Sequence, residues 1–269
     1  MKYWIISNPT VSDLYPFTSL KLPKESNYFI AESEKVVASL LACNLDISSL
    51  YLTQEHFDEK LPLIEQHQQE TEANIIIASK KEMEQIVGYP LHQGIIASAP
   101  IPKETTLEEL LATSQKPHLF IILDTIADAE NVGALYRTAL AMNATAIILD
   151  ASSVSPWIRR AVRVSMGAVF KLPTITSANP LETIEYLNGN GITTIAAEIT
   201  PNSKPVWDVN FNSDVAIVFG SEGYGIRNEL LEACQHVVDI PMTKDVQSLN
   251  VTVAQGMFLY EVARQRTKL

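Results

Sequence analysis

The stretch VAIVFGSEGYGIRNELLEACQHVVDIPMTKDVQSLNVTVAQGMFLYEVARQR, residues 215–266, decides the fold expected for this chain. It opens with an apolar run, Val215 to Phe219, that predicts a buried strand. A turn with three glycines, residues 220–225, and a helical pattern follow this strand. A second apolar strand, Val237 to Met242, leads into another polar loop and then into a last helix over 251–266. Two strand–loop–helix junctions in succession are typical of α/β sheets that bind ligands beyond the carboxyl ends of their strands.

The glycine turn is a weak signal by itself. Gly220, Gly223 and Gly225 do not form the dinucleotide fingerprint G-x-G-x-x-G, and no Gly-Lys-Ser/Thr of a phosphate loop follows. An ordinary glycine-rich turn explains the pattern as well as a ligand site does. The functional interpretation therefore depends on the other loops.

Composition and length indicate a two-domain protein of the cytoplasm. The chain has 269 residues, 46% of them hydrophobic, which is enough for a sizeable core. No apolar run reaches the length of a membrane span, and no leader pattern precedes the first expected strand, so we expect no membrane partner. Cys43 and Cys234 lie in apolar helical patterns and predict buried free thiols. The five histidines are scattered, so we expect no metal.

The net charge of −11 argues at first against a nucleic-acid partner, but the charge is unevenly distributed. Residues 1–115 carry 16 acidic residues, eight lysines and no arginine. All seven arginines follow, and three of them, Arg159, Arg160 and Arg163, lie within five positions. Arginine suits bidentate contacts with phosphate, so these three are candidate RNA-binding residues.

The alternation of strands and helices predicts two α/β domains. Residues 1–100 form a small α/β domain in which short strands alternate with helices. Residues 101–117 are polar, flanked by prolines, and predict a linker with one helical turn near Leu107. Residues 118–269 hold six expected strands alternating with helices, which predicts a mostly parallel sheet covered on both faces.

Each polar residue of the loops has an ordinary interpretation when it is considered alone. Asn131 could cap the helix that follows it, and for this residue alone capping is the better interpretation. Arg137 could be a solvated surface residue. The dipole of a helix would favour Glu222 at its mouth, and Ser248 and Asn250 could cap the last helix. Only their combined spacing is informative.

Taken together, three spaced motifs resemble a known family. The motifs are Asn131-Val132-Gly133 with Arg137-Thr138-Ala139, Gly220-Ser221-Glu222-Gly223-x-Gly225, and Ile240-Pro241-Met242 with Ser248-Leu249-Asn250-Val251. They resemble the ordered motifs of the SpoU/TrmH family of RNA 2′-O-ribose methyltransferases, within the SPOUT superfamily. The resemblance covers roughly 118–266, and a further family block resembles Arg163 to Ala168. Residues 28–100 are more loosely similar to a small substrate-binding domain that precedes such catalytic domains.

The resemblance implies a fold, a cofactor and an assembly. The fold is a SPOUT-type α/β sheet with a C-terminal trefoil knot. The cofactor is S-adenosylmethionine, the substrate is structured RNA (tRNA or rRNA), and the active protein is a homodimer with composite sites. For the cofactor pocket the resemblance implies Gly220, Glu222, Ile240, Met242, Ser248, Leu249 and Asn250. As catalytic residues it implies Arg137, Asn131, Glu222, Ser248 and Asn250.

Within that resemblance, Arg137 would act at the ribose hydroxyl. An arginine is a poor base, so we favour a phosphate anchor that also stabilises the developing alkoxide, and its taking the proton itself stays open. The arginine-free first domain binds either RNA through lysines and shape, or a protein.

Two other classes of function fit parts of the sequence. One is a catalytically silent RNA-binding or assembly protein that keeps the cofactor pocket, against which the intact motif residues argue. The other is a nucleotide-dependent oxidoreductase on a related sheet, against which the missing dinucleotide fingerprint argues.

Overall fold

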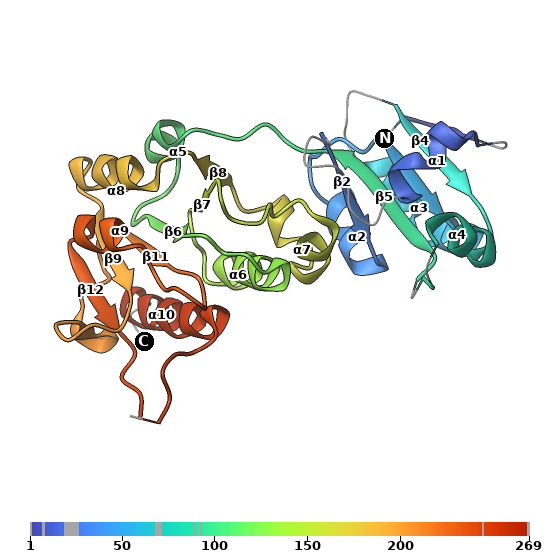
Figure 1. The fold of residues 1–269 in the computed structure, drawn as a ribbon. Coiled ribbons are helices and arrows are strands. Elements are labelled where there is room, and N and C mark those ends of the chain that lie inside the picture. The colour runs from blue at the N-terminus through green and yellow to red at the C-terminus, as the bar shows by residue number, and fades with distance from the viewer. Residues whose placement is uncertain are drawn as a thin grey trace. The chain divides into compact units, whose positions relative to one another are not determined.

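The structure is a computed structural model that describes residues 2–6, 9–18, 27–67, 72–88, 90–91, 93–243 and 245–267. The chain divides into two compact units (Figure 1). Unit 1 consists of Met1–Lys103 and Ser155–Lys171, and unit 2 consists of Glu104–Val154 and Leu172–Leu269. The sequence predicted two domains that are each continuous in the chain. In the structure, Ser155–Lys171, from the middle of the expected second domain, belongs to unit 1.

Unit 1 is a five-stranded sheet with helices against it. Its strands lie in the order β1-β4-β3-β5-β2, with β1, β4 and β3 parallel and β5 antiparallel to both of its neighbours. Its elements are β1 (Tyr3–Ile5), α1 (Val11–Thr18), β2 (Tyr28–Glu32), α2 (Glu34–Leu41), β3 (Ser49–Leu52), α3 (Gln54–Gln66), β4 (Ala73–Ile77), α4 (Lys80–Val87), β5 (Ile95–Pro100), α7 (Arg159–Val164) and the 3₁₀ helix η1 (Ala168–Phe170).

The segment Ser155–Lys171 packs on the edge strand β2 of unit 1. The ring of Phe29 lies 5.0 Å from that of Trp157 and 5.3 Å from that of Phe170, between centroids. Aromatic pairs at such distances contribute about 0.5–1.5 kcal/mol each beyond the area they bury. The sequence predicts a helix here, but its packing partner lies more than 120 residues earlier in the chain.

Unit 2 is a seven-stranded sheet in which all six strand pairs are parallel. The strand order is β10-β12-β9-β11-β6-β7-β8. Its elements are α5 (Leu107–Thr113), β6 (Leu119–Leu123), α6 (Ala129–Ala141), β7 (Ala146–Asp150), β8 (Thr174–Ser177), α8 (Pro180–Gly189), β9 (Thr193–Ala197), β10 (Lys204–Pro205), the 3₁₀ helix η2 (Val206–Asp208), β11 (Val215–Phe219), α9 (Asn228–Ala233), β12 (His236–Asp239) and α10 (Val251–Arg266). The expectation of a mostly parallel α/β sheet is confirmed.

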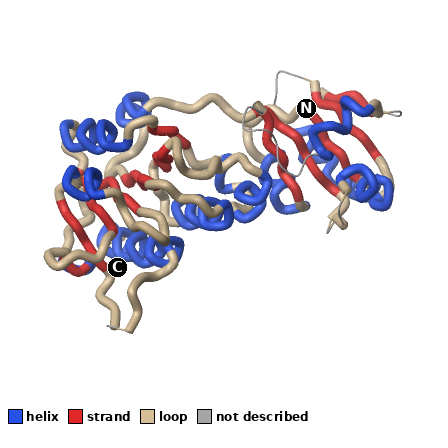
Figure 2. The backbone as a smooth tube through the Cα atoms, in the orientation of Figure 1, coloured by secondary structure: helices blue, strands red, loops and turns tan. Residues whose placement is uncertain are grey.

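Helices cover both faces of this sheet (Figure 2). All residues of the neighbouring strands β6 and β11 are buried, as expected for strands that are covered on both sides. On one face, Phe120 and Val218 pack with α5, α8 and α9 in a common core. On the other face, α6 and α10 pack against each other, and the ring of Phe219 meets that of Phe258 edge-on at 5.7 Å.

The region expected to be a linker contributes to the core of unit 2. Thr106 and Glu109 form a capping box that begins α5, and Leu107 and Leu110 of that helix are buried in the core of unit 2. Within the described ranges, no helix is both long enough and apolar enough to cross a membrane.

Candidate active site

The loops that follow β6, β11 and β12 meet at one edge of the sheet of unit 2. Residues 119–123 of β6 pair in register with 215–219 of β11, so the loops after these strands leave the sheet side by side. β12 lies two strands from β11, beyond β9, and runs parallel to them. In parallel α/β sheets this edge is where ligands bind.

The turn after β11 has a backbone shape that requires glycine at two positions. Ser221 and Gly225 form an antiparallel bridge through N–H···O bonds of 3.2 and 2.9 Å. A Cβ atom on Gly220 would lie 2.2 Å from the carbonyl carbon of Gly225, which no side chain could occupy. Gly225 has a φ of +69°, and a Cβ there would lie 2.5 Å from the Glu198 carboxylate. The turn is therefore a closed loop packed against Glu198.

A hydrogen-bonded group links all three motifs within one chain. The Asn131 amide donates to Glu222 Oε1 at 3.0 Å. The Asn250 amide also donates to Glu222 Oε1, and it approaches the Asn131 oxygen at 3.2 Å. Residues that are 91 and 119 positions apart in sequence thus share one contact. We call Asn131, Glu222 and Asn250 the amide–carboxylate group.

Helix capping explains Asn250 but not Asn131. Asp128, not Asn131, is the N-cap of α6, and its carboxylate accepts from the N–H groups of Glu130 and Asn131 at 2.6 and 3.2 Å. The capping interpretation of Asn131 is therefore wrong, and its side chain is available for Glu222. Asn250 caps α10 through its oxygen, which accepts from Thr252 N–H at 2.9 Å, while its amide nitrogen belongs to the amide–carboxylate group. Ser248 is not the cap.

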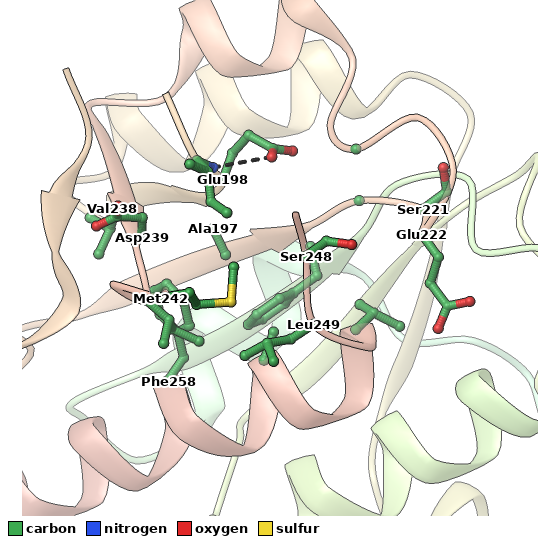
Figure 3. A pocket seen from close by; sticks show the side chains of 17 residues that line it. Ala197, Glu198, Ser221, Glu222, Val238, Asp239, Met242, Ser248, Leu249 and Phe258 are labelled. Atoms are coloured by element: carbon green, nitrogen blue, oxygen red, sulfur yellow. Dashed lines mark hydrogen bonds between the residues drawn. The ribbon is translucent and has the colours of Figure 1, made fainter. Parts of the chain in front are cut away.

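A cavity of about 160 Å³ lies beside this group (Figure 3). It is bounded by the glycine turn, by the ends of β9 and β12, and by the first turns of α10. Apolar side chains form much of its wall, among them Phe219, Val238, Leu249 and Phe258. Six of the seven residues expected to bind the cofactor line the cavity, namely Gly220, Glu222, Ile240, Met242, Ser248 and Leu249. Asn250, the seventh, contacts Glu222 at its side.

A buried ion network fixes the end of the glycine turn, and sequence reasoning missed it. Asp124 follows β6 and Asp150 ends β7, and both are almost fully buried. Arg227, at the start of α9, donates to Asp124 Oδ1 at 2.8 Å and to Asp150 Oδ2 at 3.0 Å. Its backbone N–H also donates to Asp124 Oδ2 at 2.9 Å. An aspartate directly after each of two apolar strands was the signal available in the sequence.

The charges of this network perturb the pKa of the arginine. Burial alone would lower the pKa of Arg227, but the hydrogen bonds and negative charge of Asp124, followed by Asp150 and Glu229, raise it above its usual value. The guanidinium therefore stays charged and holds two buried carboxylates beneath the site.

Arg137 stands apart from the cavity within its own chain. It is exposed on α6 and forms no hydrogen bond or ion pair with any residue in the described ranges. It is not among the residues that line the cavity. The structure of one chain thus unites Asn131, Glu222 and Asn250 and leaves Arg137 outside.

The three clustered arginines occupy different environments in unit 1. Arg159 Nε donates to Glu32 Oε2 at 2.9 Å, and the two side chains are 9% and 10% exposed. Burial lowers the pKa of Arg159, and the nearby Glu32 charge opposes that shift. Arg160 and Arg163 are exposed on the same short helix. Arg159 is thus committed to a buried ion pair, and Arg160 and Arg163 remain the candidates for phosphate contact.

The described part of the chain contains no metal site and no thiol with a lowered pKa. Cys43 and Cys234 are free thiols, but each is only partly buried, which corrects the expectation of fully buried thiols. This partial burial raises the pKa of both, that of Cys234 to about 12. No group of three or more His, Cys, Asp or Glu side chains in those residues is placed to hold a metal ion.

Two family models match the chain. A model described as the SpoU rRNA Methylase family matches residues 118–260, and a model described as RNA 2'-O ribose methyltransferase substrate binding matches residues 34–105.

Curated relatives match over most of the chain. The 23S rRNA (guanosine-2'-O-)-methyltransferase RlmB of Acinetobacter baylyi is 34% identical over 193 residues, which is 70% of this chain and 77% of the relative. The RlmB protein of Coxiella burnetii is 33% identical over 226 residues, or 82% and 88% of the two chains.

Solved structures share the fold over nearly the whole length. An AdoMet-bound rRNA methyltransferase from Sinorhizobium meliloti superposes with a TM-score of 0.81 at 22% identity, covering 97% of this chain and 98% of that one. A structure titled RNA 2'-O ribose methyltransferase gives a TM-score of 0.76 at 25% identity, with coverage of 98% and 99%.

Proposed function

The chain belongs to the SpoU rRNA methylase family, and from that premise we propose that it methylates a ribose 2′-hydroxyl of ribosomal RNA. The methyl donor in this proposal is S-adenosylmethionine. The observation that carries it is the amide–carboxylate group, which joins Asn131, Glu222 and Asn250 beside a cavity formed by the expected cofactor residues. A catalytically silent relative would have no need to keep three distant side chains in one hydrogen-bonded contact.

The chemistry of the cavity lining suits S-adenosylmethionine. The missing Cβ of Gly220 lets the backbone of Gly225 come close to it, and this contact shapes the turn that lines the cavity. Phe219, Leu249 and Phe258 offer apolar surface suited to a purine ring. The lining also contains carboxylates, Glu198 among them, which complement a positively charged ligand. When bound, this cofactor supplies a methyl group on a sulfonium, which an oxygen nucleophile attacks in line.

In this proposal the amide–carboxylate group positions the hydroxyl that is methylated. Two amide N–H groups hold Glu222 through Oε1. Its other oxygen accepts no hydrogen bond from any residue that the structure describes, so it is available to orient a ribose hydroxyl. In such a transfer the hydroxyl would lose its proton to solvent water as the O–CH₃ bond formed, the sulfur would keep the electron pair of the broken S–CH₃ bond, and negative charge would develop on the hydroxyl oxygen. A guanidinium near that oxygen stabilises the charge, and this is the role that we assign to Arg137.

We further propose that Arg137 serves the cavity of a second copy in a homodimer. Val253, Met257 and Tyr260 form a stripe along α10, with 50%, 45% and 62% of each residue exposed. Residues spaced by three and four positions share one helix face. An exposed apolar stripe of this kind fits burial between two copies of the chain. The exposure of Arg137 away from its own cavity supports its use by the partner.

Co-refolding of two inactive variants tests the shared site. Arg137→Ala and Asn250→Ala should each be nearly inactive as homodimers. If the site is shared, mixed dimers contain one intact site, so roughly a quarter of all sites should recover when about half the dimers are mixed. Size-exclusion chromatography with light scattering checks the dimer first. Verified mixed dimers without any recovered activity would contradict the shared site.

The trefoil knot and a cytoplasmic location also belong to this proposal. The knot is supported by family membership, and a crystal structure of the dimer with its methyl donor would test it. The location follows from the proposed substrate, because ribosomal RNA is made and assembled in the bacterial cytoplasm.

The proposed RNA is 23S ribosomal RNA, because the curated relatives are named for a guanosine of that molecule. In vitro transfer of a labelled methyl group to 23S rRNA, with tRNA as the alternative substrate, tests the choice. Mapping of 2′-O-methyl sites in cells that lack the gene identifies the nucleotide. Binding of the donor with no methylation of either RNA would instead favour a silent binding protein.

A further inference from the structure

The described lining of the cavity carries negative charge and contains no basic side chain. Three carboxylates line it, from Glu198, Glu222 and Asp239, and none of its described lining residues is lysine, arginine or histidine. None of these carboxylates forms an ion pair with another residue in the described ranges. Such a cavity favours a ligand with net positive charge.

Two backbone N–H groups hold the Glu198 carboxylate in place. It directly follows β9, and its Oε2 accepts from the Ile226 N–H at 3.0 Å. Its Oε1 accepts from the neighbouring Ile199 N–H at 3.1 Å. Figure 3 shows the carboxylate extending towards the glycine turn, where Gly225 leaves the space that it occupies. Backbone N–H groups are neutral donors, so they fix the carboxylate and leave its negative charge uncompensated.

Asp239 adds to the same field from the end of β12. One of its carboxylate oxygens, Oδ1, is buried and has no hydrogen-bond partner among the described residues. A buried carboxylate oxygen without a donor is costly, and a nearby cation reduces that cost. The carboxylates of Glu198 and Asp239, at the ends of β9 and β12, therefore favour a positively charged ligand at this wall of the cavity.

We propose that Glu198 makes the cavity selective for the positively charged methyl donor over its neutral product. This inference rests on the proposed function. At neutral pH S-adenosylmethionine carries an ammonium, a carboxylate and a sulfonium, a net charge of +1. S-adenosylhomocysteine has lost the sulfonium charge with the methyl group and is neutral overall. Selectivity of this kind helps turnover, because the reaction itself removes the charge that Glu198 attracts, and the product then leaves more readily.

Coulomb's law sets the size of the expected preference. Two unit charges about 8 Å apart attract one another enough to change affinity about twofold in a water-like medium and about thirtyfold at the effective dielectric of a protein surface. The affinity for the methyl donor should therefore exceed the affinity for the product by a factor within that range.

Isothermal titration of the full-length protein with three ligands tests the inference. The probes are S-adenosylmethionine, S-adenosylhomocysteine and sinefungin, an analogue whose amine restores a positive charge near the position of the sulfonium. The wild-type protein should bind both cations more tightly than the neutral product. Glu198→Gln keeps a carbonyl oxygen for the Ile226 N–H and should bring the three affinities together, mainly by weakening the two cations. Glu185→Gln removes a charge from an exposed site on α8 and should leave the preference unchanged.

The outcomes separate this inference from the proposed function. Equal loss of affinity for all three ligands in Glu198→Gln would mean that Glu198 only shapes the turn, and would overturn the inference. An unchanged preference in that variant would overturn it as well. Binding of donor and product with equal affinity by the wild-type protein would refute the selectivity alone. Failure of the wild-type protein to bind any of the ligands would refute the proposed function itself.

Discussion

Replacing Arg227 by methionine should lower the unfolding temperature of unit 2 by about 6–12 °C. The change keeps an unbranched apolar stem but removes the guanidinium that contacts Asp124 and Asp150 at 2.8 and 3.0 Å. Those two residues are 0% and 3% exposed, so their carboxylates would stay buried without their counter-ion.

The magnitude follows from the burial of the partners. Removing one member of a buried ion pair costs about 3–5 kcal/mol. We take the lower end, about 3 kcal/mol, because the Arg227 side chain is itself 41% exposed. For a domain of this size each kcal/mol shifts the unfolding temperature by about 2–4 °C, which gives the expected range.

Differential scanning calorimetry measures the shift, and Lys204→Met is the control. Lys204 lies in the same unit, is exposed and has no side-chain partner in the described ranges, so its replacement should change stability by no more than about 0.5 kcal/mol. A double-mutant cycle with Asp124→Asn should show coupling of about 0.5–3 kcal/mol. If Arg227→Met unfolds at the same temperature as Lys204→Met, the ion network does not stabilise the turn and the reasoning fails.

Three further predictions address the cofactor, the RNA and the thiols. Gly220→Ala should abolish donor binding in calorimetry while circular dichroism stays native-like, because the new Cβ would lie 2.2 Å from a backbone carbon; unchanged binding would refute the close-packed turn. Arg160→Ala with Arg163→Ala should weaken RNA binding and reduce the slope of log affinity against log salt by about 1–2, measured by fluorescence anisotropy; an unchanged slope would place the RNA elsewhere. Because burial raises the pKa of both thiols, that of Cys234 to about 12, a thiol reagent at pH 8 should react slowly with the native protein and rapidly after denaturation. Rapid reaction of both thiols in the native state would contradict the raised pKa values.

The local pattern of the chain predicts most elements of unit 2. The strand over 215–219 and the helix over 251–266 match the expected ranges, because fully buried strands are continuous apolar runs and Asn250 marks the helix start. The strand expected to reach Met242 ends at Asp239, and the residues after it turn to line the cavity. The two-residue strand β10 carries no pattern that could reveal it.

Long-range packing was beyond the reach of such patterns. Arg159 has the same local context as Arg160 and Arg163, and only the fold brings Glu32 to it. Arg227 likewise looked like one polar position of a helix, whereas it is the counter-ion of two buried aspartates from other loops. The spacing of the motifs predicted which loops meet at one edge of the sheet, but not the contacts that join them.

The assignment of Ser155–Lys171 to unit 1 has a consequence for how the protein is made. On the ribosome, β2 emerges long before its aromatic partners Trp157 and Phe170, which the strand needs to cover Phe29. At about 5–20 residues per second, the nascent first unit waits on the order of several seconds with an edge strand exposed. That strand is the place where a nascent-chain chaperone should bind. Gene fusions that exchange only the first hundred residues should produce aggregation-prone chains. The exchanged unit would then lack its own Ser155–Lys171 segment, which covers β2.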